Sequence, residues 1–236
     1  MNIEFNNLLE PYNIRCSEKQ LEQFNLYYEL LIDSNKRTNL TTITNKNDVI
    51  IKHFFDSITP SFYFNFGKQN IIDVGAGAGF PSIPLKILFP DLKITLLDSL
   101  GKRITFLNLI KDNLFLEDVT IIHGRAEELG VMKEHREIYD IAIARALARL
   151  DVLCELCLPF VKKDGLMIAF KGAKAREEIS KASKAFKILG GVLYQEHYFK
   201  LPYENGERAI ILVKKIKDTP KKYPRKPGDP NRAPII

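Results

Sequence analysis

The chain contains little cysteine: Cys16, Cys154 and Cys157 are the only three among 236 residues. The odd number and the lack of a signal peptide argue against a disulfide framework and favour a reducing, cytoplasmic setting. Cys154 and Cys157 have CxxC spacing, but the sequence offers no second CxxC and no HxxxH to complete a zinc site. We expect two small buried side chains on a helix and no metal, with metal or redox use as the alternative.

Long apolar runs are also missing, since none approaches the ~20 residues that a membrane-spanning helix needs. Neither internal repeats nor low-complexity segments occur. Hydrophobic residues make up 45% of the chain and charged residues 27%, which is typical of a soluble globular protein. A chain of 236 residues suits one large domain, or one domain with a small extension. We therefore expect no association with a membrane.

The net charge of +6 is concentrated near the C-terminus. Eight basic and two acidic residues lie in 214–232, so this stretch carries the whole excess, and 27 basic residues balance 27 acidic residues elsewhere. A neutral body with a cationic end favours a polyanionic partner. A tail that only increases solubility is the alternative.

The first 66 residues are predicted to form a helical extension. Ser17 and Gln20 have the spacing of a capping box, and the apolar side chains that follow recur at helical spacing. These are Leu21, Phe24, Tyr28 and Leu31. A break at 38–42 precedes a second expected helix over 48–62, with an apolar face formed by Ile51, Phe54, Phe55 and Ile58.

From residue 67 to 216, short apolar runs alternate with helical stretches. Strands are expected at 71–74, 93–97, 119–122, 139–144 and 165–170, and helices at 81–89, 101–114, 149–160 and 174–189. This alternation predicts an α/β fold with a parallel sheet covered on both faces. Gly190 and Gly191 should end the last helix. Two further strands, 192–201 and 208–215, flank the turn signal Asn205-Gly206 and predict an antiparallel hairpin.

Five parallel strands followed by a hairpin are typical of class I (Rossmann-like) methyltransferases. The fold class expected is therefore a doubly wound, mostly parallel seven-stranded sheet with a terminal antiparallel hairpin and an N-terminal helical extension. Residues 217–236 are expected to form a separate basic, proline-rich C-terminal segment.

A glycine-rich turn after the first strand is the main cofactor signal. It contains Asp73, Gly75, Gly77, Gly79 and Phe80 in a strand–loop–helix context. Glycines allow the backbone to turn sharply and to approach a ligand closely. The GxGxG spacing differs from the GxGxxG of nicotinamide cofactors, and a bulky phenylalanine stands where their third glycine would fall. S-adenosylmethionine has no pyrophosphate, so it tolerates this residue; a chance glycine turn is the alternative.

Three later strands also end in candidate ligand contacts, because open α/β sheets bind ligands at the carboxyl ends of their strands. Asp98 can accept hydrogen bonds from both ribose hydroxyls of an adenosine. The Ala126 amide and the Glu127 side chain would border the adenine, although Glu127 also suits a helix cap. Arg145 should point into the ligand crevice, with a structural salt bridge as the competing interpretation.

Taken together, these motifs resemble one family over nearly the whole chain. They are Asn39-Leu-Thr41, Lys52-His-Phe-Phe-Asp-Ser57, the glycine turn from Asp73 to Pro81, Gly124-Arg-Ala-Glu127, Ala144-Arg-Ala146 and Arg225-Lys-Pro-Gly-Asp-Pro230. The glycine turn alone is generic, whereas the HxxDS segment and the RKPGDP segment are specific. The chain resembles the RsmG (GidB) family of bacterial methyltransferases that modify guanine N7 in 16S ribosomal RNA.

The resemblance implies that Gly75, Phe80, Ala126, Glu127 and Arg145 line the pocket for S-adenosylmethionine. It also implies a 16S ribosomal RNA substrate, free or in a small-subunit assembly intermediate. We expect a cytoplasmic monomer.

Guanine N7 already carries an exposed lone pair, so the reaction needs alignment rather than a base. The absence of an Asn/Asp-Pro-Pro-aromatic sequence and of a Pro-Cys nucleophile agrees with this. Candidate catalytic residues are Arg145, touching O6 or a phosphate, and the pair His53 and Asp56 on one helix face. A structural histidine is the alternative for His53, and a local turn hydrogen bond is the alternative for Asn39.

The proline content of the C-terminal segment predicts that it forms no helix and extends along RNA phosphates. Its candidate RNA-binding residues are Lys221, Lys222, Arg225, Lys226 and Arg232. Other classes of function stay open: a NAD-dependent oxidoreductase, a methyltransferase for another RNA, a small molecule or a protein, and a non-catalytic RNA-binding protein.

Overall fold

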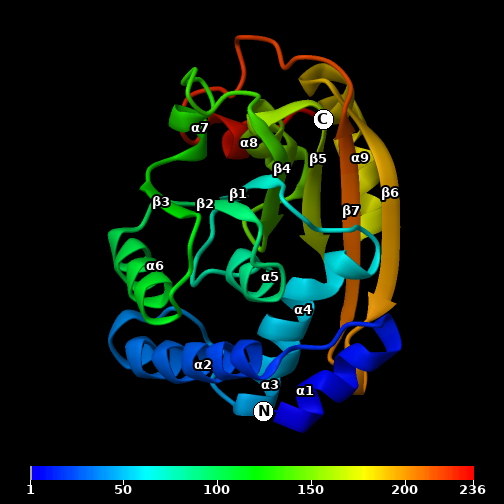
Figure 1. Cartoon of the computed structure of the whole chain (residues 1–236). Coiled ribbons are helices and arrows are strands. Elements are labelled where there is room, and N and C mark those ends of the chain that lie inside the picture. Colours follow the sequence, from blue (N-terminus) through cyan, green and yellow to red (C-terminus); the bar gives the residue numbers. More distant parts are fainter. Residues whose placement is uncertain (1) are drawn as a thin grey trace.

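The computed structural model describes residues 2–236 as one seven-stranded sheet with helices on both faces (Figure 1). The strand order is β3-β2-β1-β4-β5-β7-β6. The strands are β1 (Asn70–Val74), β2 (Lys93–Asp98), β3 (Val119–His123), β4 (Tyr139–Arg145), β5 (Val161–Lys171), β6 (Gly191–Lys200) and β7 (Glu207–Lys215). The first five are parallel and β7 is antiparallel to both β5 and β6, as predicted.

The predicted helices between the strands are confirmed, with small shifts at their ends. They are α5 (Ser82–Leu88), α6 (Gly101–Asn113), α8 (Leu150–Cys157), extended by the 3-10 turn η4 (Leu158–Phe160), and α9 (Ala175–Leu189). Gly190 ends α9 in the left-handed conformation, at φ 86°, which glycine adopts without strain. A further short helix, α7 (Ala126–Leu129), follows β3.

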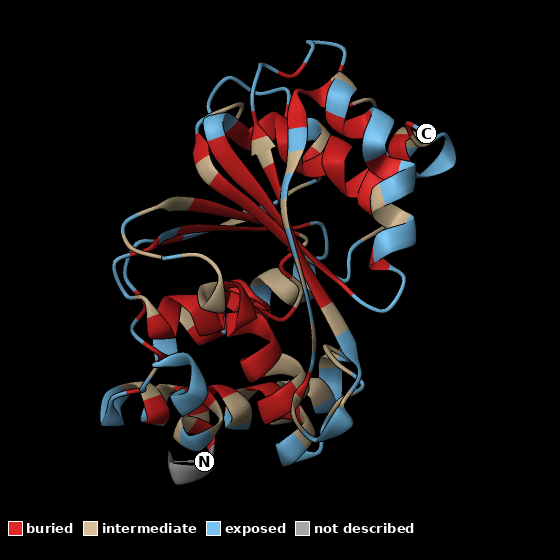
Figure 2. Ribbon diagram, turned by 90° about the vertical axis from the view of Figure 1, so that its right-hand side faces the viewer, coloured by how far each residue is buried: buried red, intermediate tan, exposed pale blue. Residues whose placement is uncertain are grey.

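Two hydrophobic cores lie on opposite faces of the sheet, because successive residues of a strand point to opposite sides. Ile71 belongs to the core beneath the N-terminal helices, α5 and α6, whereas Ile72 belongs to the core beneath α8 and α9. Ile141 and Ala142 of β4 are divided in the same way. Figure 2 shows this double layer of buried residues on either side of the strands.

The N-terminal extension begins with α1 (Asn2–Leu9) and the 3-10 turn η1 (Glu10–Tyr12), followed by the long helix α2 (Glu18–Thr38). Ser17 forms the predicted capping box with Gln20. Of the side chains at helical spacing, Leu21, Phe24 and Leu31 are buried and Tyr28 is half-buried, whereas its neighbour Tyr27 is fully buried. Either tyrosine fits the helical spacing. Tyr27 is the one that packs inside, because it reaches the glycine turn.

The expected helix over 48–62 is a composite. It consists of α3 (Lys46–Val49), the π-helical segment η2 (Ile50–Phe55), α4 (Asp56–Ile58) and the 3-10 turn η3 (Thr59–Phe62). The Asp56 amide donates to the Ile51 carbonyl, five residues back, instead of the usual four. The predicted apolar face of Ile51, Phe54, Phe55 and Ile58 is buried.

The C-terminal segment, residues 217–236, packs on the molecule and is not extended throughout. Residues Asp229–Arg232 form the short helix α10, which contradicts the prediction that proline excludes a helix here. Pro230 lies in the first turn of α10, where the missing N–H of proline has no intrahelical partner to lose.

Cys154 and Cys157 are buried and unpaired on α8, as expected. Burial raises the pKa of the Cys157 thiol far above its ordinary value, which keeps the thiol protonated. Within residues 2–236, we find no group of three or more His, Cys, Asp or Glu side chains arranged to hold a metal ion. No helix in this part of the chain is both long and apolar enough to span a bilayer.

Candidate functional site

The glycine turn is held over the end of β2. The amides of Gly75 and Ala76 both donate to the Leu97 carbonyl, at 2.8 and 3.0 Å, and the Gly77 amide donates to Asp98 Oδ2 at 2.9 Å. These bonds join the loops after β1 and β2 into one edge. The turn predicted from sequence is therefore a fixed structure at the carboxyl ends of two neighbouring parallel strands.

Gly77 and Gly79 serve different purposes in this turn. Both adopt left-handed backbone angles, with φ of +61° and +92°. A Cβ at Gly79 would lie 2.6 Å from Ile83 and 2.8 Å from Tyr27, so this glycine allows close packing beneath the turn. A Cβ at Gly77 would meet no atom closer than 3.9 Å. Gly77 thus presents bare backbone to the open side, where a ligand can approach.

Asp73 and Ser82 lie completely buried beneath the turn. The Ser82 amide donates to Asp73 Oδ2 at 3.3 Å, whereas Asp73 Oδ1 and Ser82 Oγ are buried without a hydrogen-bond partner. Burial raises the pKa of Asp73 to about 7, although the hydrogen bond from the Ser82 amide opposes the shift. A buried carboxylate that titrates near neutrality next to a glycine turn marks this spot as a functional candidate.

Asp98, the expected ribose ligand, is almost fully buried at the end of β2. Its Oδ1 accepts a hydrogen bond from the Leu100 amide at 3.0 Å, and its Oδ2 accepts one from the Gly77 amide. The Arg103 guanidinium also contacts Oδ2, at 3.1 Å. Asp98 therefore fixes the glycine turn in addition to standing at the predicted position.

Arg145 connects the end of β4 with the N-terminal extension. Its Nη1 donates to Asp56 Oδ2 and to the Lys52 carbonyl, each at 3.0 Å. Its guanidinium lies 5.1 Å from the centre of the Phe80 ring, a cation–π contact. The ion pair is well shielded, since 12% of the Arg145 side chain and 5% of the Asp56 side chain are exposed.

His53 completes this cluster. Arg145 donates to His53 Nδ1 at 3.3 Å, which leaves the ring proton on Nε2, facing Thr41 Oγ1 at 2.8 Å. Burial, reinforced by the Arg145 charge, lowers the pKa of His53 to about 3. The imidazole is therefore neutral at physiological pH, with both nitrogens engaged. Three of the candidate residues, Arg145, His53 and Asp56, thus lie together, with Phe80 packed against them, and the salt bridge of Arg145 agrees with its competing interpretation.

A pocket of about 390 Å³ opens beside this cluster. It is lined by Lys52, His53, Asp56, Arg145, Ala146, Phe170, Lys171, Gly172 and Arg208. Arg208 lies on β7, and its Nε donates to Asp56 Oδ1 at 3.1 Å. The Asp56 carboxylate therefore lies between the guanidiniums of Arg145 and Arg208. Four basic side chains against one carboxylate make the lining cationic, which suits a phosphate or a nucleotide.

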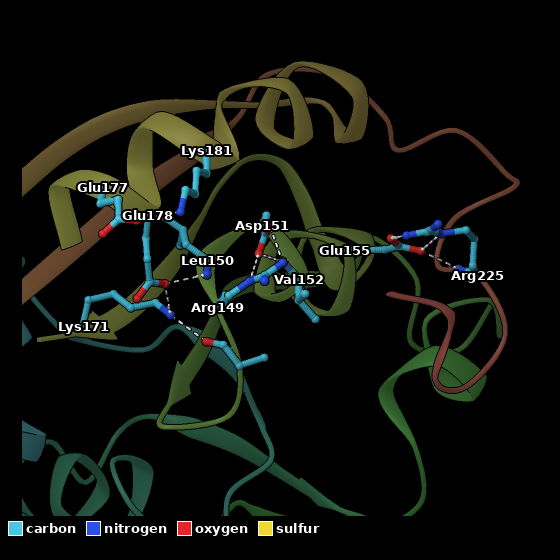
Figure 3. A network of polar contacts seen from close by, with 11 residues as sticks. Arg149, Leu150, Asp151, Val152, Glu155, Lys171, Glu177, Glu178, Lys181 and Arg225 are labelled. Carbon is cyan, nitrogen blue, oxygen red and sulfur yellow. Dashed lines mark hydrogen bonds and ion pairs between the residues drawn. The ribbon is translucent and has the colours of Figure 1, made fainter. Parts of the chain in front are cut away.

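Lys171, at the end of β5, supports the loop that follows Arg145. Its ammonium donates to the Ala148 carbonyl at 2.6 Å and pairs with Glu178 of α9 at 2.7 Å (Figure 3). Glu178 also accepts a hydrogen bond from the Leu150 amide at 2.8 Å. These bonds fix the connection from β4 to α8, so the role of Lys171 is mainly structural.

Ala126 and Glu127 begin α7, next to the end of β3. Ala126 is buried, and the Glu127 carboxylate accepts a hydrogen bond from the amide of Gly228 in the C-terminal segment, at 3.1 Å. Glu127 also lies in the first turn of α7, where a carboxylate favours the helix N-terminus, so the helix-capping alternative remains open. Asn39 lies apart from the pocket lining as the left-handed C-cap of α2.

The candidate RNA-binding residues divide into two sets. Lys221, Lys222, Lys226 and Arg232 are exposed. Arg225 instead forms a two-point ion pair with Glu155 of α8, whose side chain is only 1% exposed. Arg225 Nε lies 2.8 Å from Glu155 Oε1, and Nη2 lies 2.5 Å from Oε2. Arg225 is therefore an internal anchor, because its guanidinium is committed to this pair, and we no longer assign it to RNA.

Sequence reasoning missed Tyr27, Arg208 and Lys171. Tyr27 donates to the Ala78 carbonyl and stacks on Phe80, with ring centres 5.2 Å apart, although 50 residues separate it from the glycine turn. Lys171 carried a usable signal, since it ends a parallel strand as Arg145 does. Arg208 had no local signal: only the antiparallel pairing of β7 with β5 brings it to the pocket.

Solved structures with the same fold include the two that follow. One is a predicted O-methyltransferase from Agrobacterium tumefaciens, with a TM-score of 0.54 and 15% identity, covering 67% of this chain and 79% of that chain. Another is M. jannaschii TYW2 in complex with AdoMet, with a TM-score of 0.52 and 16% identity, covering 68% and 77%. At these identities the likeness shows the fold alone, and it confirms the Rossmann-like methyltransferase class.

Closer relatives share the whole chain. The ribosomal RNA small subunit methyltransferase G of Bacillus subtilis (strain 168) is 56% identical over 237 residues, covering 100% of this chain and 99% of the relative. That of Bacillus licheniformis is 57% identical with the same coverage. The family model GidB, described as rRNA small subunit methyltransferase G, matches residues 20–209. The chain therefore belongs to the rRNA small subunit methyltransferase G (GidB) family, as its motifs indicated.

Proposed function

We propose that this protein transfers a methyl group from S-adenosylmethionine to N7 of a guanine in 16S ribosomal RNA. The observation that carries the proposal is the position of Arg145 and Phe80, which join the glycine turn to a cationic pocket at the neighbouring strand ends. Membership of the family and the names of its relatives support the ribosomal RNA substrate.

The glycine turn fits S-adenosylmethionine by the chemistry of its donors and acceptors. The unpartnered Asp73 Oδ1 and Ser82 Oγ are suited to an ammonium group, and Gly77 presents open backbone beside them. Asp98 provides a carboxylate at the end of the next strand. We assign these residues to cofactor binding with Gly75, Gly79, Phe80, Ala126, Glu127 and Arg145. When bound, the cofactor supplies an electrophilic methyl group on sulfur.

The cationic pocket fits the target nucleotide. Guanine presents O6 and N7 as acceptors on one edge, and arginine is the side chain that most often reads that edge. A donor on N7 would block the lone pair that must attack, so Arg145 is assigned to O6 or to a phosphate. Lys52 and Arg208 add charge for the RNA backbone at the rim of the pocket.

Catalysis in this arrangement comes from positioning. His53 is neutral, and its two nitrogens are occupied by Arg145 and Thr41, so it orients Arg145 instead of taking a proton. Asp56 holds Arg145 and Arg208 in fixed directions. Aligning N7 with the methyl carbon and the sulfur removes much of the entropic barrier to a displacement of this kind.

The exposed cations of the C-terminal segment, Lys221, Lys222, Lys226 and Arg232, are proposed to contact RNA phosphates. We also propose that the protein works as a cytoplasmic monomer on the ribosomal RNA of an assembling or complete small subunit. These proposals rest on exposure and charge together with the family.

Mass spectrometry of 16S ribosomal RNA tests the function. 16S ribosomal RNA from cells lacking this protein should contain one 7-methylguanosine fewer than 16S ribosomal RNA from otherwise identical cells that contain it. The purified protein with S-adenosylmethionine labelled in the methyl group should restore that nucleoside on small subunits from the deficient cells. Unchanged 7-methylguanosine content, or label in another nucleoside, would refute the proposal.

A further inference from the structure

The C-terminal segment lies against α7 and α8, on the side of the sheet opposite to the N-terminal helices (Figure 1). Tyr223, Pro230 and Ile235 are buried there, and Tyr223 and Ile235 belong to the same core as Ala126 and Leu129 of α7. The segment is thus part of the folded body at the place where α7 needs support. A helix of one turn has little stability of its own, so its position depends on what packs around it.

The first anchor is the pair between Arg225 and Glu155. Glu155 accepts from the Arg225 backbone amide at 2.8 Å in addition to the two-point contact with the guanidinium, and Figure 3 shows Arg225 reaching α8 from the C-terminal segment. Two parallel N–H···O bonds to one buried carboxylate fix both distance and orientation. The pair therefore fixes one point of the segment on a rigid helix.

The second anchor is Arg136, which binds the segment and the end of α7 together. Its Nη1 donates to the carbonyls of Gly130 and Tyr223, each at 2.9 Å, and its Nη2 donates to the Thr219 carbonyl at 2.7 Å. Gly130 is the C-cap of α7, and a Cβ there would lie 2.9 Å from Pro224. The end of α7 and the segment are therefore in direct contact.

The third anchor reaches the site itself. The Gly228 amide donates to Glu127 Oε1 at 3.1 Å, so the segment sets the direction of a carboxylate assigned to the adenine side of the cofactor site. Gly228 follows Arg225 by only three positions in the chain. The Arg225–Glu155 pair therefore determines where this amide lies.

We propose that the C-terminal segment positions α7, and with it Ala126 and Glu127, for binding the adenosine part of S-adenosylmethionine. Arg225 and Arg136 are positioning residues that act through α7, without touching the cofactor. This inference rests on the proposed function, because it assumes that the site takes S-adenosylmethionine. The segment then contains two kinds of basic residue. Arg225 faces inward and supports the cofactor site, whereas the exposed lysines face outward and are assigned to RNA binding.

The test compares an anchor variant with a surface variant in the full-length protein. Arg225→Gln removes the two-point pair, and Arg136→Lys keeps the charge but removes the fork that bridges Gly130 and Tyr223. The matched control is Lys221→Ala with Lys222→Ala, both exposed. For each protein we would measure the Kd of S-adenosylhomocysteine by calorimetry, the Kd of 16S ribosomal RNA by filter binding, the KM for S-adenosylmethionine, kcat and thermal unfolding.

Each anchor variant is expected to raise the Kd of S-adenosylhomocysteine and the KM for S-adenosylmethionine about tenfold, while kcat at saturating cofactor and RNA affinity change less than threefold. The control should weaken RNA binding and leave S-adenosylhomocysteine affinity unchanged. A folded Arg136→Lys protein with native S-adenosylhomocysteine affinity would overturn the inference, as would equal losses of cofactor and RNA binding. Native protein that does not bind S-adenosylhomocysteine would instead refute the proposed function.

Discussion

The imidazole of His53 stacks on the ring of Phe80, with ring centres 4.5 Å apart and planes inclined by 17°. This contact joins the N-terminal extension to the glycine turn, which lies on the main sheet. It places the histidine between the turn and Arg145. The extension is therefore a structural part of the site, although the sequence predicted it as a separate region of residues 1–66.

Asp56 provides the first prediction, because it neutralises two guanidiniums. Asp56→Asn keeps the shape of the side chain but leaves Arg145 and Arg208 without a counter-charge, so we expect a loss of about 3 kcal/mol in unfolding free energy. Methylation of small subunits should fall at least tenfold, because Arg145 loses its fixed direction. Urea denaturation and initial rates measure the two effects.

The control for Asp56→Asn is Glu177→Gln, which breaks an exposed pair with Lys181 on α9. It should leave both the unfolding free energy and the rate nearly unchanged, because an exposed ion pair contributes little to stability. Equal effects of the two substitutions would contradict a special role for Asp56.

The glycine turn provides a matched pair of substitutions. Gly79→Ala places a methyl group within 3 Å of Ile83 and Tyr27, so the protein should lose stability, by about 2 kcal/mol or more. Gly77→Ala places the methyl group on the open side and should cost only about 1 kcal/mol for its left-handed backbone. Thermal unfolding should rank the two variants in this order.

Ligand binding distinguishes the same pair more sharply. Gly77→Ala should abolish measurable S-adenosylhomocysteine binding in a protein that is still folded, because its methyl group lies where the ligand approaches. A folded Gly77→Ala protein that binds normally would show that the cofactor lies elsewhere.

Asp73 provides a pH prediction. Its pKa is about 7 in the folded protein and its ordinary value is 3.8, so the folded state binds more protons between these limits. Below about pH 3.8, the protonated Asp73 makes its full contribution to the free energy of unfolding. This contribution is lost as the pH rises to 7, and the maximum loss is on the order of 4 kcal/mol. Asp73→Asn should lack this dependence, so the difference in unfolding free energy between variant and native protein should grow from pH 4 to pH 7.

Cofactor binding should shift the same equilibrium in the opposite direction. A ligand ammonium near Asp73 favours the ionised carboxylate, so uptake of S-adenosylhomocysteine at pH 6 should release protons. Calorimetry in buffers of different ionisation enthalpy would detect the release. An identical binding enthalpy in all buffers at pH 6 would exclude Asp73 from the site.

Lys52 provides a test of the RNA surface. It lines the cationic pocket and pairs at 2.9 Å with Asp48, one turn away on the surface. Lys52→Ala should weaken binding of 16S ribosomal RNA and reduce by about 0.7 to 1 the slope of log affinity against log salt concentration. The affinity for S-adenosylhomocysteine should not change. An unaltered slope would remove Lys52 from the RNA contact.

Much of the fold could be predicted because its signals are local. The glycine turn, the capping box at Ser17 and the hairpin signal at Asn205-Gly206 each lie within a few residues, and the structure confirms the turn, the box and the hairpin. The hairpin loop is longer than an Asn-Gly turn, since it includes the 3-10 turn Pro202–Glu204 and Asn205 has a φ of −71°. Arg145, His53 and Asp56 were found from strand ends and motif spacing, and the structure brings them together.

The remaining features depend on contacts between distant segments. Nothing near Arg225 in the sequence indicates a buried partner 70 residues earlier, and its neighbours suggested an RNA-binding tail. Arg208 likewise reaches Asp56 across 152 residues of chain through sheet pairing. The π-helical turn was not predicted because the apolar spacing at Ile51, Phe54, Phe55 and Ile58 also fits an α-helix.

The π-helical segment Ile50–Phe55 makes the length of this stretch as important as its composition. Deleting one residue there would let the segment relax into an ordinary α-helix, and each residue of an α-helix turns the chain by about 100°. Residues from Asp56 to Phe62 would then rotate relative to Lys46–Val49. With Lys46–Val49 in their present position, the Asp56 carboxylate could no longer face both Arg145 and Arg208. Evolution at this point should therefore tolerate exchanges of side chains but reject changes in residue number.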